Sequence, residues 1–230
     1  WEAVTWPPPY NGDMVPLGPV PGSVPAFAFA ITEAINAAGI VAGWTLLNAT
    51  SPEQGFTHGP AGYRLLGLTA VPGALNSFAF GLNNAGDVVG YVDTSTWDGT
   101  KFVFATRAFL ARGEAMSDLG MLPGHTSSQA VAINAHREIV GTGSSLLGAT
   151  RGFVRLGGTM FDLNALIDPL AGYIVRTAEA VYERGQIAGA AEFGGQRRPV
   201  LLTPIAGPAD VTGLRVARDG ANPARVALTW

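Results

Sequence analysis

The sequence contains no cysteine, few charged residues and no long apolar run, and each absence excludes a class of protein. Without cysteine there are no disulfides, no thiol catalysis and no Cys-ligated zinc. Charged residues make up only 13% of the 230 residues, the net charge is −3, and no basic stripe is present, so we expect no nucleic-acid partner. No stretch reaches the ~18 apolar residues that a transmembrane helix needs.

What the sequence does contain favours an all-β fold. Apolar residues make up 47% of the chain, which is enough to bury a sizeable core, and 31 glycines and 16 prolines punctuate it. Many glycines with few charges indicate short strands and tight turns, not long amphipathic helices. No charged-then-apolar signal sequence precedes the first strand, and the chain runs from Trp1 to Trp230. Because it begins with Trp1 rather than Met and stops abruptly at Trp230, we expect it to be a piece of something longer, and the lack of cysteine fits a bacterial exported protein.

The strongest signal is an internal repeat. Four segments share one pattern, in which Asn stands at the second position and Gly at the fifth and ninth, with β-branched residues on both sides; they span 35–43, 82–90, 133–141 and 181–189. The closing glycines are 47, 51 and 48 residues apart; they are Gly43, Gly90, Gly141 and Gly189. Such a near-constant period indicates a repeat architecture with one structural unit per copy.

The shared pattern predicts a hairpin turn. Asn followed three residues later by Gly, as in Asn36 and Gly39, is what a type I turn closed by a left-handed residue prefers, which predicts a G1-type bulge. Two copies depart from it. Arg137 stands at the glycine position of the third copy, where a left-handed conformation would cost it roughly 1 kcal/mol. Tyr182 stands at the Asn position of the fourth copy.

A second element follows each hairpin, in which a short apolar strand leads through a polar turn to another strand. Its clearest copies are 108–120 and 152–164, an N-terminal version spans 3–18, and weaker versions span 63–68 and 199–203. Each full unit is therefore expected to hold four strands in about 48 residues. Asp118 and Asp162 occupy one repeat position, which predicts caps that accept backbone N–H bonds.

Residues 107–124 and 127–141 resemble the bacterial extracellular HAF repeat, which runs His-Ala-Phe-Leu-Trp, Gly-x-Met-x-Asp-Leu-Gly-x-Leu-Gly-Gly and Ala-x-x-Ile-Asn-x-x-Gly-x-Val-Val-Gly. The match is specific in 103–141, clear in 26–43 and 78–90, and degenerate in 151–205. Arg107, Ala111 and Pro123 replace the His, the Trp and a Gly of that pattern. The resemblance implies an exported, often cell-surface-associated protein with no established enzymatic activity.

We predict an all-β repeat domain over residues 1–205, β-propeller-like, with about four four-stranded antiparallel units. The N-terminal strands and the C-terminal hairpin could join into one blade and close a ring, or the chain could be an arc of a larger propeller. A β-solenoid is the alternative, although its rungs are usually shorter. Residues 206–230 resemble a linker and the first two strands of a fibronectin type III domain, and we expect this tail to pack poorly.

No residues suggest an active site, so we predict no catalytic residues, no metal and no cofactor. His58, His125 and His136 share no ligand spacing and are predicted to lie in loops. The glycine pairs at 157–158 and 194–195 are predicted to be turns, because no helix-forming run follows them. Repeat-equivalent carboxylates on separate blades would be too far apart for a paired-carboxylate glycosidase.

The loops after each hairpin, 44–62, 91–106, 142–151 and 190–198, are the longest and most variable, and in a propeller they lie on one face. Five residues are predicted to share the rim of that face, where aromatic rings could stack on sugars or dock a protein: Trp44, Tyr91, Trp97, His58 and His125. The competing interpretation is that Trp44 and Tyr91 only cap blade ends.

These observations predict a non-catalytic, extracellular, monomeric module that acts as a scaffold or binds a glycan or a cell-surface protein. The alternative is a carbohydrate-active propeller enzyme, a hydrolase or lyase, which would need two or three acids at the mouth of the central channel. The sequence offers only scattered acids, namely Glu33, Asp87, Glu138 and Glu179, of which Glu33 and Glu179 stand near equivalent positions.

Overall fold

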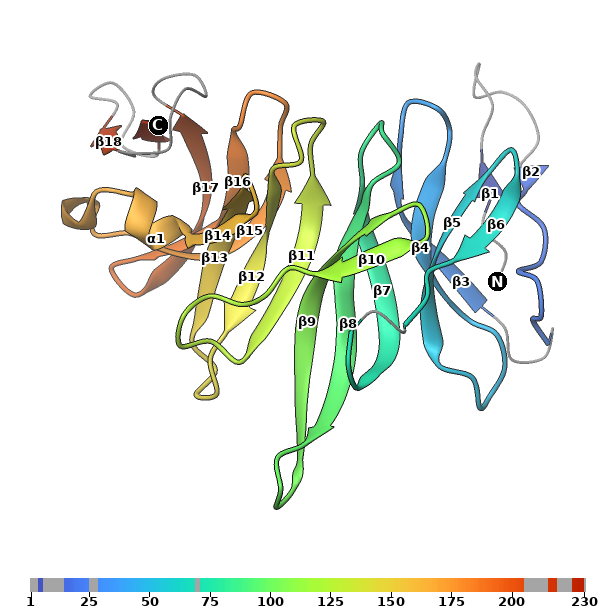
Figure 1. Cartoon of the computed structure of the whole chain (residues 1–230). Helices are drawn as coiled ribbons and strands as arrows, with labels where there is room; N and C mark the ends of the chain where they lie inside the picture. Colours follow the sequence, from blue (N-terminus) through green and yellow to red (C-terminus); the bar gives the residue numbers. More distant parts are fainter. Residues whose placement is uncertain are drawn as a thin grey trace.

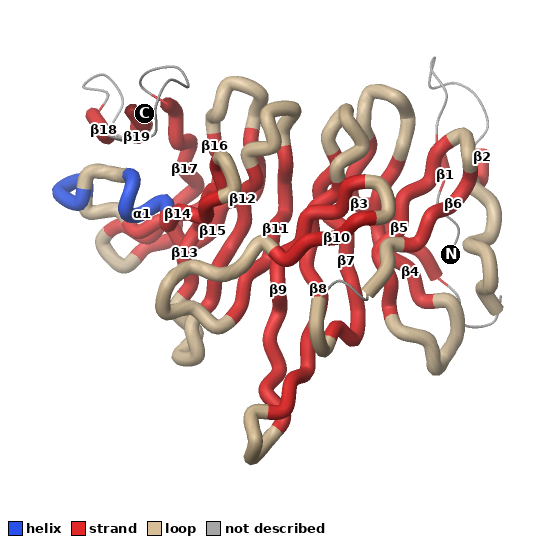
Figure 2. Tube along the Cα trace, in the orientation of Figure 1, coloured by secondary structure: helices blue, strands red, loops and turns tan. Residues whose placement is uncertain are grey.

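The computed structural model describes residues 4–5, 15–24, 29–68, 71–204, 215–218 and 225–229, and it confirms an all-β chain (Figures 1 and 2). The described helices are the one-turn helix α1 (Leu163–Leu166) and the 3-10 helix η1 (Pro169–Ala171), which follow each other in one connection between strands and were not predicted. Within the described ranges, no helix has the length and apolar character that crossing a membrane requires.

Four antiparallel sheets follow one another along the chain, each built from consecutive strands. The first sheet contains β3 (Phe29–Ile35), β4 (Val41–Leu46), β5 (Glu53–Gly59) and β6 (Gly62–Leu65). The second contains β7 (Ala74–Leu82), β8 (Val88–Trp97), β9 (Phe102–Arg112) and β10 (Ala115–Asp118). The third contains β11 (Ser127–Ile133), β12 (Ile139–Ser144), β13 (Thr150–Leu156) and β14 (Thr159–Asp162). The fourth begins with β15 (Ile174–Val181), β16 (Ile187–Phe193) and β17 (Gln196–Pro204).

Shorter strands lie at both ends of the chain. β1 (Val4–Thr5) and β2 (Val15–Pro16) form a two-stranded sheet of their own. β19 (Arg225–Thr229) pairs in parallel with β17 and antiparallel with β18 (Arg215–Arg218), so the fourth sheet ends in a strand from outside the repeats. Much of the predicted fibronectin-like tail, including 205–214, lies outside the described residues.

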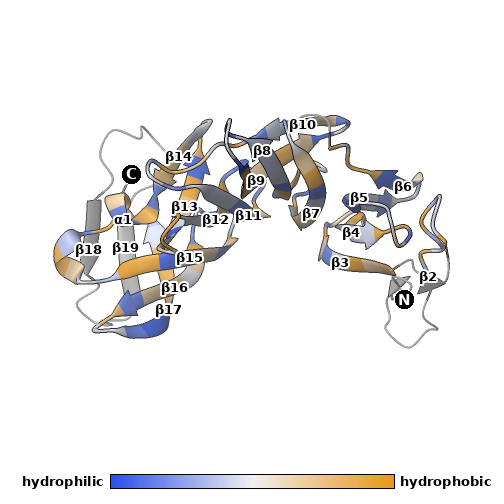
Figure 3. Cartoon of the chain, turned by 90° about the horizontal axis from the view of Figure 1, so that it is seen from below, coloured by the Kyte–Doolittle hydropathy of each residue, from blue (hydrophilic) through white to orange (hydrophobic). Residues whose placement is uncertain are grey.

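The four sheets are arranged along an arc, and the described residues form no closed ring (Figure 3). The first strands of the sheets border the inner side of this arc, and β6, β10 and β14 border its outer side. Three apolar clusters fill the spaces between neighbouring sheets. At one repeat position Phe109 belongs to the cluster between the first and second sheets and Phe153 to the next cluster, and both are fully buried.

The predicted hairpin turns are confirmed in all four sheets. Each turn has the same two backbone bonds, illustrated by Gly39 N–H donating to the Asn36 carbonyl at 3.0 Å and Asn36 N–H donating to the Ile40 carbonyl at 3.0 Å. The fourth turn residue has positive φ in every copy, including Arg137 with φ 62°, which is the only such non-glycine residue described. The third turn is therefore kept, and Arg137 occupies the left-handed region in it.

The closing glycines are required for a steric reason that is separate from the turn. A Cβ on Gly90 would lie 1.8 Å from the carbonyl oxygen of Phe78, and the three equivalent glycines meet the first strand in the same way at 1.9 to 2.1 Å. The first strand of each sheet carries a β-bulge next to the closing glycine of the second strand. In the second sheet this bulge lies between Ala79 and Gly81. The bulge pushes a carbonyl against the second strand, so only glycine fits there.

The prediction of long loops after each hairpin is wrong in extent. The segments 44–62, 91–106, 142–151 and 190–198 are largely strand, and the actual connections span only 47–52, 98–101, 145–149 and 194–195. Their β-branched and aromatic residues continue the ladders, as β8 shows by running unbroken to Trp97. Because successive strands are antiparallel, these four connections still lie at one end of the sheets, called here the loop end, and the Asn turns lie at the other, called here the turn end.

Candidate functional site

At the turn end a hydrogen-bonded ladder of Asn side chains joins the four repeats. The Nδ2 group of Asn36 donates to the carbonyl of Asn83 at 3.2 Å, that of Asn83 to the carbonyl of Asn134 at 3.1 Å, and that of Asn134 to the carbonyl of Tyr182 at 3.0 Å. The Oδ1 atom of each Asn accepts two N–H bonds within its own turn. The ladder stops at Tyr182, whose side chain has no amide to donate.

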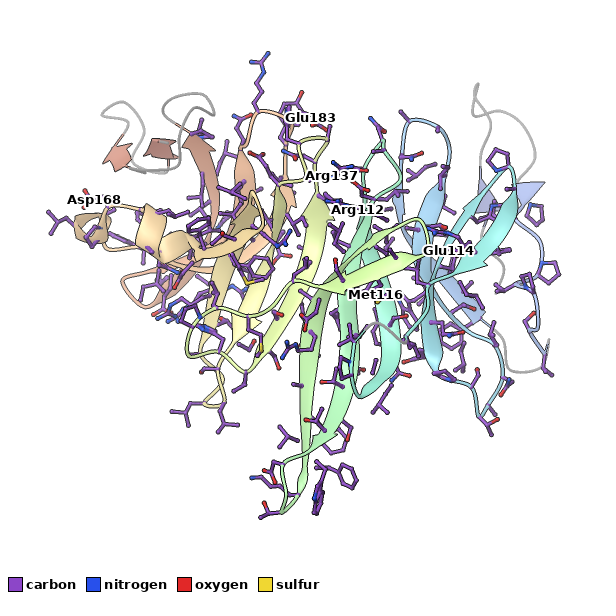
Figure 4. All side chains as sticks on the ribbon, viewed as in Figure 1. Arg112, Glu114, Met116, Arg137, Asp168 and Glu183 are labelled. Carbon is purple, nitrogen blue, oxygen red and sulfur yellow. The ribbon has the colours of Figure 1, made fainter. Side chains whose placement is uncertain are left out.

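A buried carboxylate strengthens the middle of this ladder. Asp87 is 4% exposed and accepts bonds from Asn83 Nδ2 at 3.2 Å and from Arg137 Nε at 2.6 Å, with Arg112 Nε at 3.9 Å. Figure 4 shows Arg112 and Arg137 together at this end. Glu138, at the equivalent position of the next turn, accepts from Asn134 Nδ2. Asp87 therefore joins the second turn to the third, whereas Glu138 is bonded within its own turn.

The loop end contains a different kind of surface. β8 and β9 are 10 and 11 residues long, whereas the corresponding strands of the first and third sheets have 6 and 7. The extra length forms a hairpin that projects beyond the other connections, and we call residues 94–105 the arm (Figure 1). Three large apolar side chains on the arm are exposed: Trp97 by 58%, Phe102 by 62% and Phe104 by 73%.

The three rings share one face of the arm. Trp97 is paired with Phe102 and Ser95 with Phe104, and side chains of paired and alternate residues point to the same side of a sheet. The rings of Trp97 and Phe102 meet edge to face, with centroids 5.2 Å apart. A continuous apolar face of this kind is unusual on a small protein unless it binds something.

A rigid turn holds the tip of the arm. The Asp98 carboxylate accepts bonds from the backbone N–H of Thr100 and Lys101 at 2.8 and 2.9 Å and from the Thr100 hydroxyl at 2.7 Å. These bonds, led by the one from the Thr100 hydroxyl, hold the pKa of Asp98 below its ordinary value. The Thr100 and Lys101 N–H groups are therefore satisfied within the turn itself.

Two of the predicted rim residues lie elsewhere, in a row of touching aromatic rings. Trp44 contacts Phe29 and Phe78 with centroids 5.4 and 5.2 Å apart, and Phe78 contacts Tyr91 at 4.9 Å. Trp44 and Tyr91 are half-buried. Burial raises the pKa of the Tyr91 hydroxyl above 10.0, with smaller contributions from the carboxylates of Asp93 and Glu53. This row joins the first and second sheets, as the competing interpretation of capping residues expects.

The histidines do not form a common rim. His58 lies in strand β5, not in a loop, and packs against Tyr63 with ring centroids 4.4 Å apart near the turn end, because it is paired with Val41. His125 lies in the connection before β11 at the loop end, as predicted, with Nδ1 3.1 Å from the Pro123 carbonyl and Nε2 buried. His136 lies in the third Asn turn, also as predicted. The structure thus separates His58 from Trp97.

The predicted caps at Asp118 and Asp162 are confirmed. Asp118 accepts the N–H of Gly120 and Asp162 accepts that of Asn164, each at 2.8 Å. Each Asp also lies beside an arginine of the preceding strand, Arg107 or Arg151. The predicted glycine turns at 157–158 and 194–195 are confirmed as well.

A shallow pocket of about 500 Å³ also opens between the third and fourth sheets near the loop end. Its charged residues are Arg176, Glu192 and Arg197, and Arg176 donates to Glu192 through Nε at 3.0 Å and Nη2 at 2.6 Å. No motif in the sequence pointed to this pocket. Because Arg176 is neutralised by Glu192, Arg197 is the remaining charge.

Sequence reasoning missed Phe102 and Phe104, since it treated 91–106 as a loop. The missed signal was local: Asp98-Gly99 between two β-branched and aromatic runs is a hairpin signature.

No group of three or more His, Asp or Glu side chains within the described ranges could hold a metal ion. A scan against protein-family models, a search of curated proteins and a search of solved structures each found no match.

Proposed function

We propose that this chain is a non-catalytic, extracellular binding module in which a β-propeller-like stack of HAF-type repeats displays one apolar arm to a partner protein. The observation that carries the proposal is the arm, where Trp97, Phe102 and Phe104 are more than half exposed on one face of a capped hairpin. Burying exposed aromatic residues supplies most of the binding energy in many protein interfaces. The rest of the stack would act as the scaffold that holds the arm in place.

A protein is a better fit to this surface than a glycan. Sugar sites combine a stacking ring with hydrogen-bonding side chains, but Asp98 and Thr100 already bond each other within the turn. Val103, on the opposite face, adds a further exposed apolar group. The composition of the arm, with aromatic residues and few charges, matches the core of a protein interface.

Four-stranded antiparallel units of about 48 residues, arranged along an arc, support a propeller-like assembly over a solenoid, whose rungs are shorter. The C-terminal strand pair β18–β19 is compatible with the proposed start of a fibronectin type III domain. The alternative function, a carbohydrate-active enzyme, requires converging acids. Asp87 and Glu138 are instead bound within the Asn turns, and this favours binding over catalysis.

The proposal is tested by binding of the purified protein to intact cells of its source organism. A variant with Trp97→Ser, Phe102→Ser and Phe104→Ser is compared with the wild type by flow cytometry. Because Lys101 is the only lysine in the sequence and lies in the arm tip, an amine-reactive cross-linker added after binding reports contacts at the arm when mass spectrometry maps the cross-link to Lys101 and not to the terminal amine. We expect saturable binding by the wild type, loss of at least tenfold in the variant, and cross-linking through Lys101.

The matched control replaces Leu146 and Leu147 by Ser, because these two side chains are also highly exposed at the loop end but lie outside the arm. The control should bind as the wild type does. Treatment of the cells with protease should abolish binding, and periodate oxidation of their glycans should not. Equal binding by the arm variant would refute the proposal, and loss on periodate treatment alone would replace the protein partner by a glycan.

A further inference from the structure

The N-terminal strands are the outer half of a repeat. Val4 is paired with Pro16 and Thr5 with Val15, and this pairing has the same register as that of Phe109 with Asp118 in the second sheet. The residues that follow also match. Gly18 and Gly22 have φ of 81° and 82°, and the equivalent Gly120 and Gly124 have φ of 81° and 75°. β1 and β2 therefore stand as third and fourth strands of a unit preceding the first sheet.

The inner half of that unit has no counterpart among the described residues, and the first sheet shows the consequence. Ile35 at the end of β3 is 64% exposed, whereas the equivalent Ile133 at the end of β11 is 8% exposed and belongs to the cluster between the second and third sheets. Ile31, on the same strand as Ile35, is also exposed, by 39%. The face that the other sheets bury against a preceding inner hairpin is open here.

In the Asn ladder each side-chain amide donates to the carbonyl of the following repeat, so the first carbonyl, that of Asn36, has no such donor among the described residues. The carbonyls of Asn83, Asn134 and Tyr182 each accept an amide from the preceding repeat. The Asn36 carbonyl accepts the N–H of Gly39 in its own turn, and no Asn amide from a preceding repeat reaches it within the described part of the chain. A carbonyl has two lone pairs, so it can take this second bond.

We propose that the N-terminal end of the arc is a docking site for one β-hairpin of this protein's own repeat type, carrying an Asn turn. The hairpin would pair with the edge of β1 that no described strand occupies, cover Ile35, and donate its Asn Nδ2 to the carbonyl of Asn36. The occupant must carry that Asn. The fourth repeat does not, because Tyr182 replaces it, so head-to-tail stacking of a second copy would lack the ladder bond.

The test uses a hairpin taken from the third repeat, residues 127–144, cyclised through a D-Pro-Gly turn so that it is preorganised. It is added to the full, isotope-labelled protein, and binding is followed by NMR. We expect saturable shifts at residues 31–41 and at β1. A variant protein with Ile35→Lys should bind at least tenfold more weakly, and a Leu146→Lys control at the loop end should bind as the wild type does.

A second pair of peptides isolates the ladder bond. Both carry Glu138→Gln, and one also carries Asn134→Asp, which keeps the turn-forming acceptor but removes the Nδ2 donor. We expect the Asp peptide to bind about fivefold more weakly, as the loss of one net hydrogen bond implies. Shifts located at the fourth sheet, absence of saturable binding up to millimolar peptide, or equal binding of the two peptides would overturn the proposal.

Discussion

The turn end and the loop end of these sheets are built from the same strands but use their side chains in opposite ways. At the turn end, Asn, Asp and Arg side chains bond neighbouring turns, and four turns of nearly equal geometry result. At the loop end, the four connections differ in length and sequence, and one of them extends into the arm. The repeated turn end therefore stabilises the fold, and the variable loop end is the part available to a partner.

This comparison indicates where substitutions should be costly. The ladder Asn side chains and Asp87 at the turn end are buried and bonded to one another or to the backbone, so removing one leaves another unpaired. The exposed rings of the arm already face water, so removing them should cost the fold little.

Gly90→Ala should cost the most. The new Cβ would lie 1.8 Å from the Phe78 carbonyl oxygen, and both groups belong to backbone that cannot move independently. We expect a loss of roughly 3 kcal/mol or more in the free energy of unfolding. Urea denaturation checks this value, with Gly67→Ala as the control, because a Cβ there meets nothing within 4 Å. Similar small losses in both variants would contradict the steric explanation.

Asn83→Ala should follow closely. It removes the two bonds that Oδ1 accepts in its own turn, the ladder bond to the Asn134 carbonyl and a partner of Asp87. We expect a loss of about 2–3 kcal/mol by urea denaturation. Asn48→Ala, which removes an exposed turn at the loop end, should cost under about 1 kcal/mol. Equal losses of unfolding free energy in the two variants would mean that the ladder does not stabilise the fold.

These glycine and Asn positions show which features of the fold could be predicted from the sequence. The spacing of the four closing glycines, from Gly43 to Gly189, predicted four hairpins, and their turns are as expected because turn chemistry is local. A G1-type bulge at the turn was predicted, but the separate bulge in the first strand opposite each closing glycine was not, because it depends on a carbonyl of another strand. The ladder was also missed, since it joins residues 47 to 51 positions apart whose Asn was already explained by its own turn.

The candidate site was harder to predict than the fold. Trp97 was singled out correctly as a residue of the loop end, but its partners Phe102 and Phe104 were hidden in a supposed loop. His58 was misplaced because strand β5 lies within the segment 44–62 that was expected to be a loop. Whether an aromatic side chain is exposed, as Trp97 is, or half-buried, as Trp44 is, depends on packing between sheets that no local pattern encodes.

Arg137→Gly should produce a smaller change. It relieves the left-handed strain on a non-glycine residue, worth about 1 kcal/mol, and it removes the bond from Nε to the buried Asp87. The two effects oppose each other, so we expect a net change under about 1 kcal/mol. With Asp87→Ala as background, only the relief of strain remains, and Arg137→Gly should then stabilise. Destabilisation in both backgrounds would show that Arg137 acts through another contact.

The arm variant Trp97→Ser, Phe102→Ser, Phe104→Ser should leave stability almost unchanged. Each ring is more than half exposed and the turn at Asp98 remains, so we expect a shift under about 0.5 kcal/mol per substitution in urea denaturation. A loss as large as that of Asn83→Ala would place the arm in the folding core and remove the contrast between the two ends.

The smallest effect concerns the arm tip. The pKa of Asp98 is lowered in the folded state, so its contribution to the turn is present above the ordinary pKa and is lost as pH falls through the folded value. Thr100→Ala removes the hydroxyl that is the largest cause, and the titration midpoint of Asp98 should rise toward the ordinary value. NMR titration of the side-chain carboxyl measures it, and an unchanged midpoint would contradict the assignment.

The ladder itself can be measured through hydrogen exchange of the Asn side-chain amides. If the Nδ2 groups of Asn36, Asn83 and Asn134 bridge successive repeats, their protons should exchange with water far more slowly than those of the exposed Asn84. Exchange at the rate of Asn84 in all three would mean that the repeats are not joined in this way.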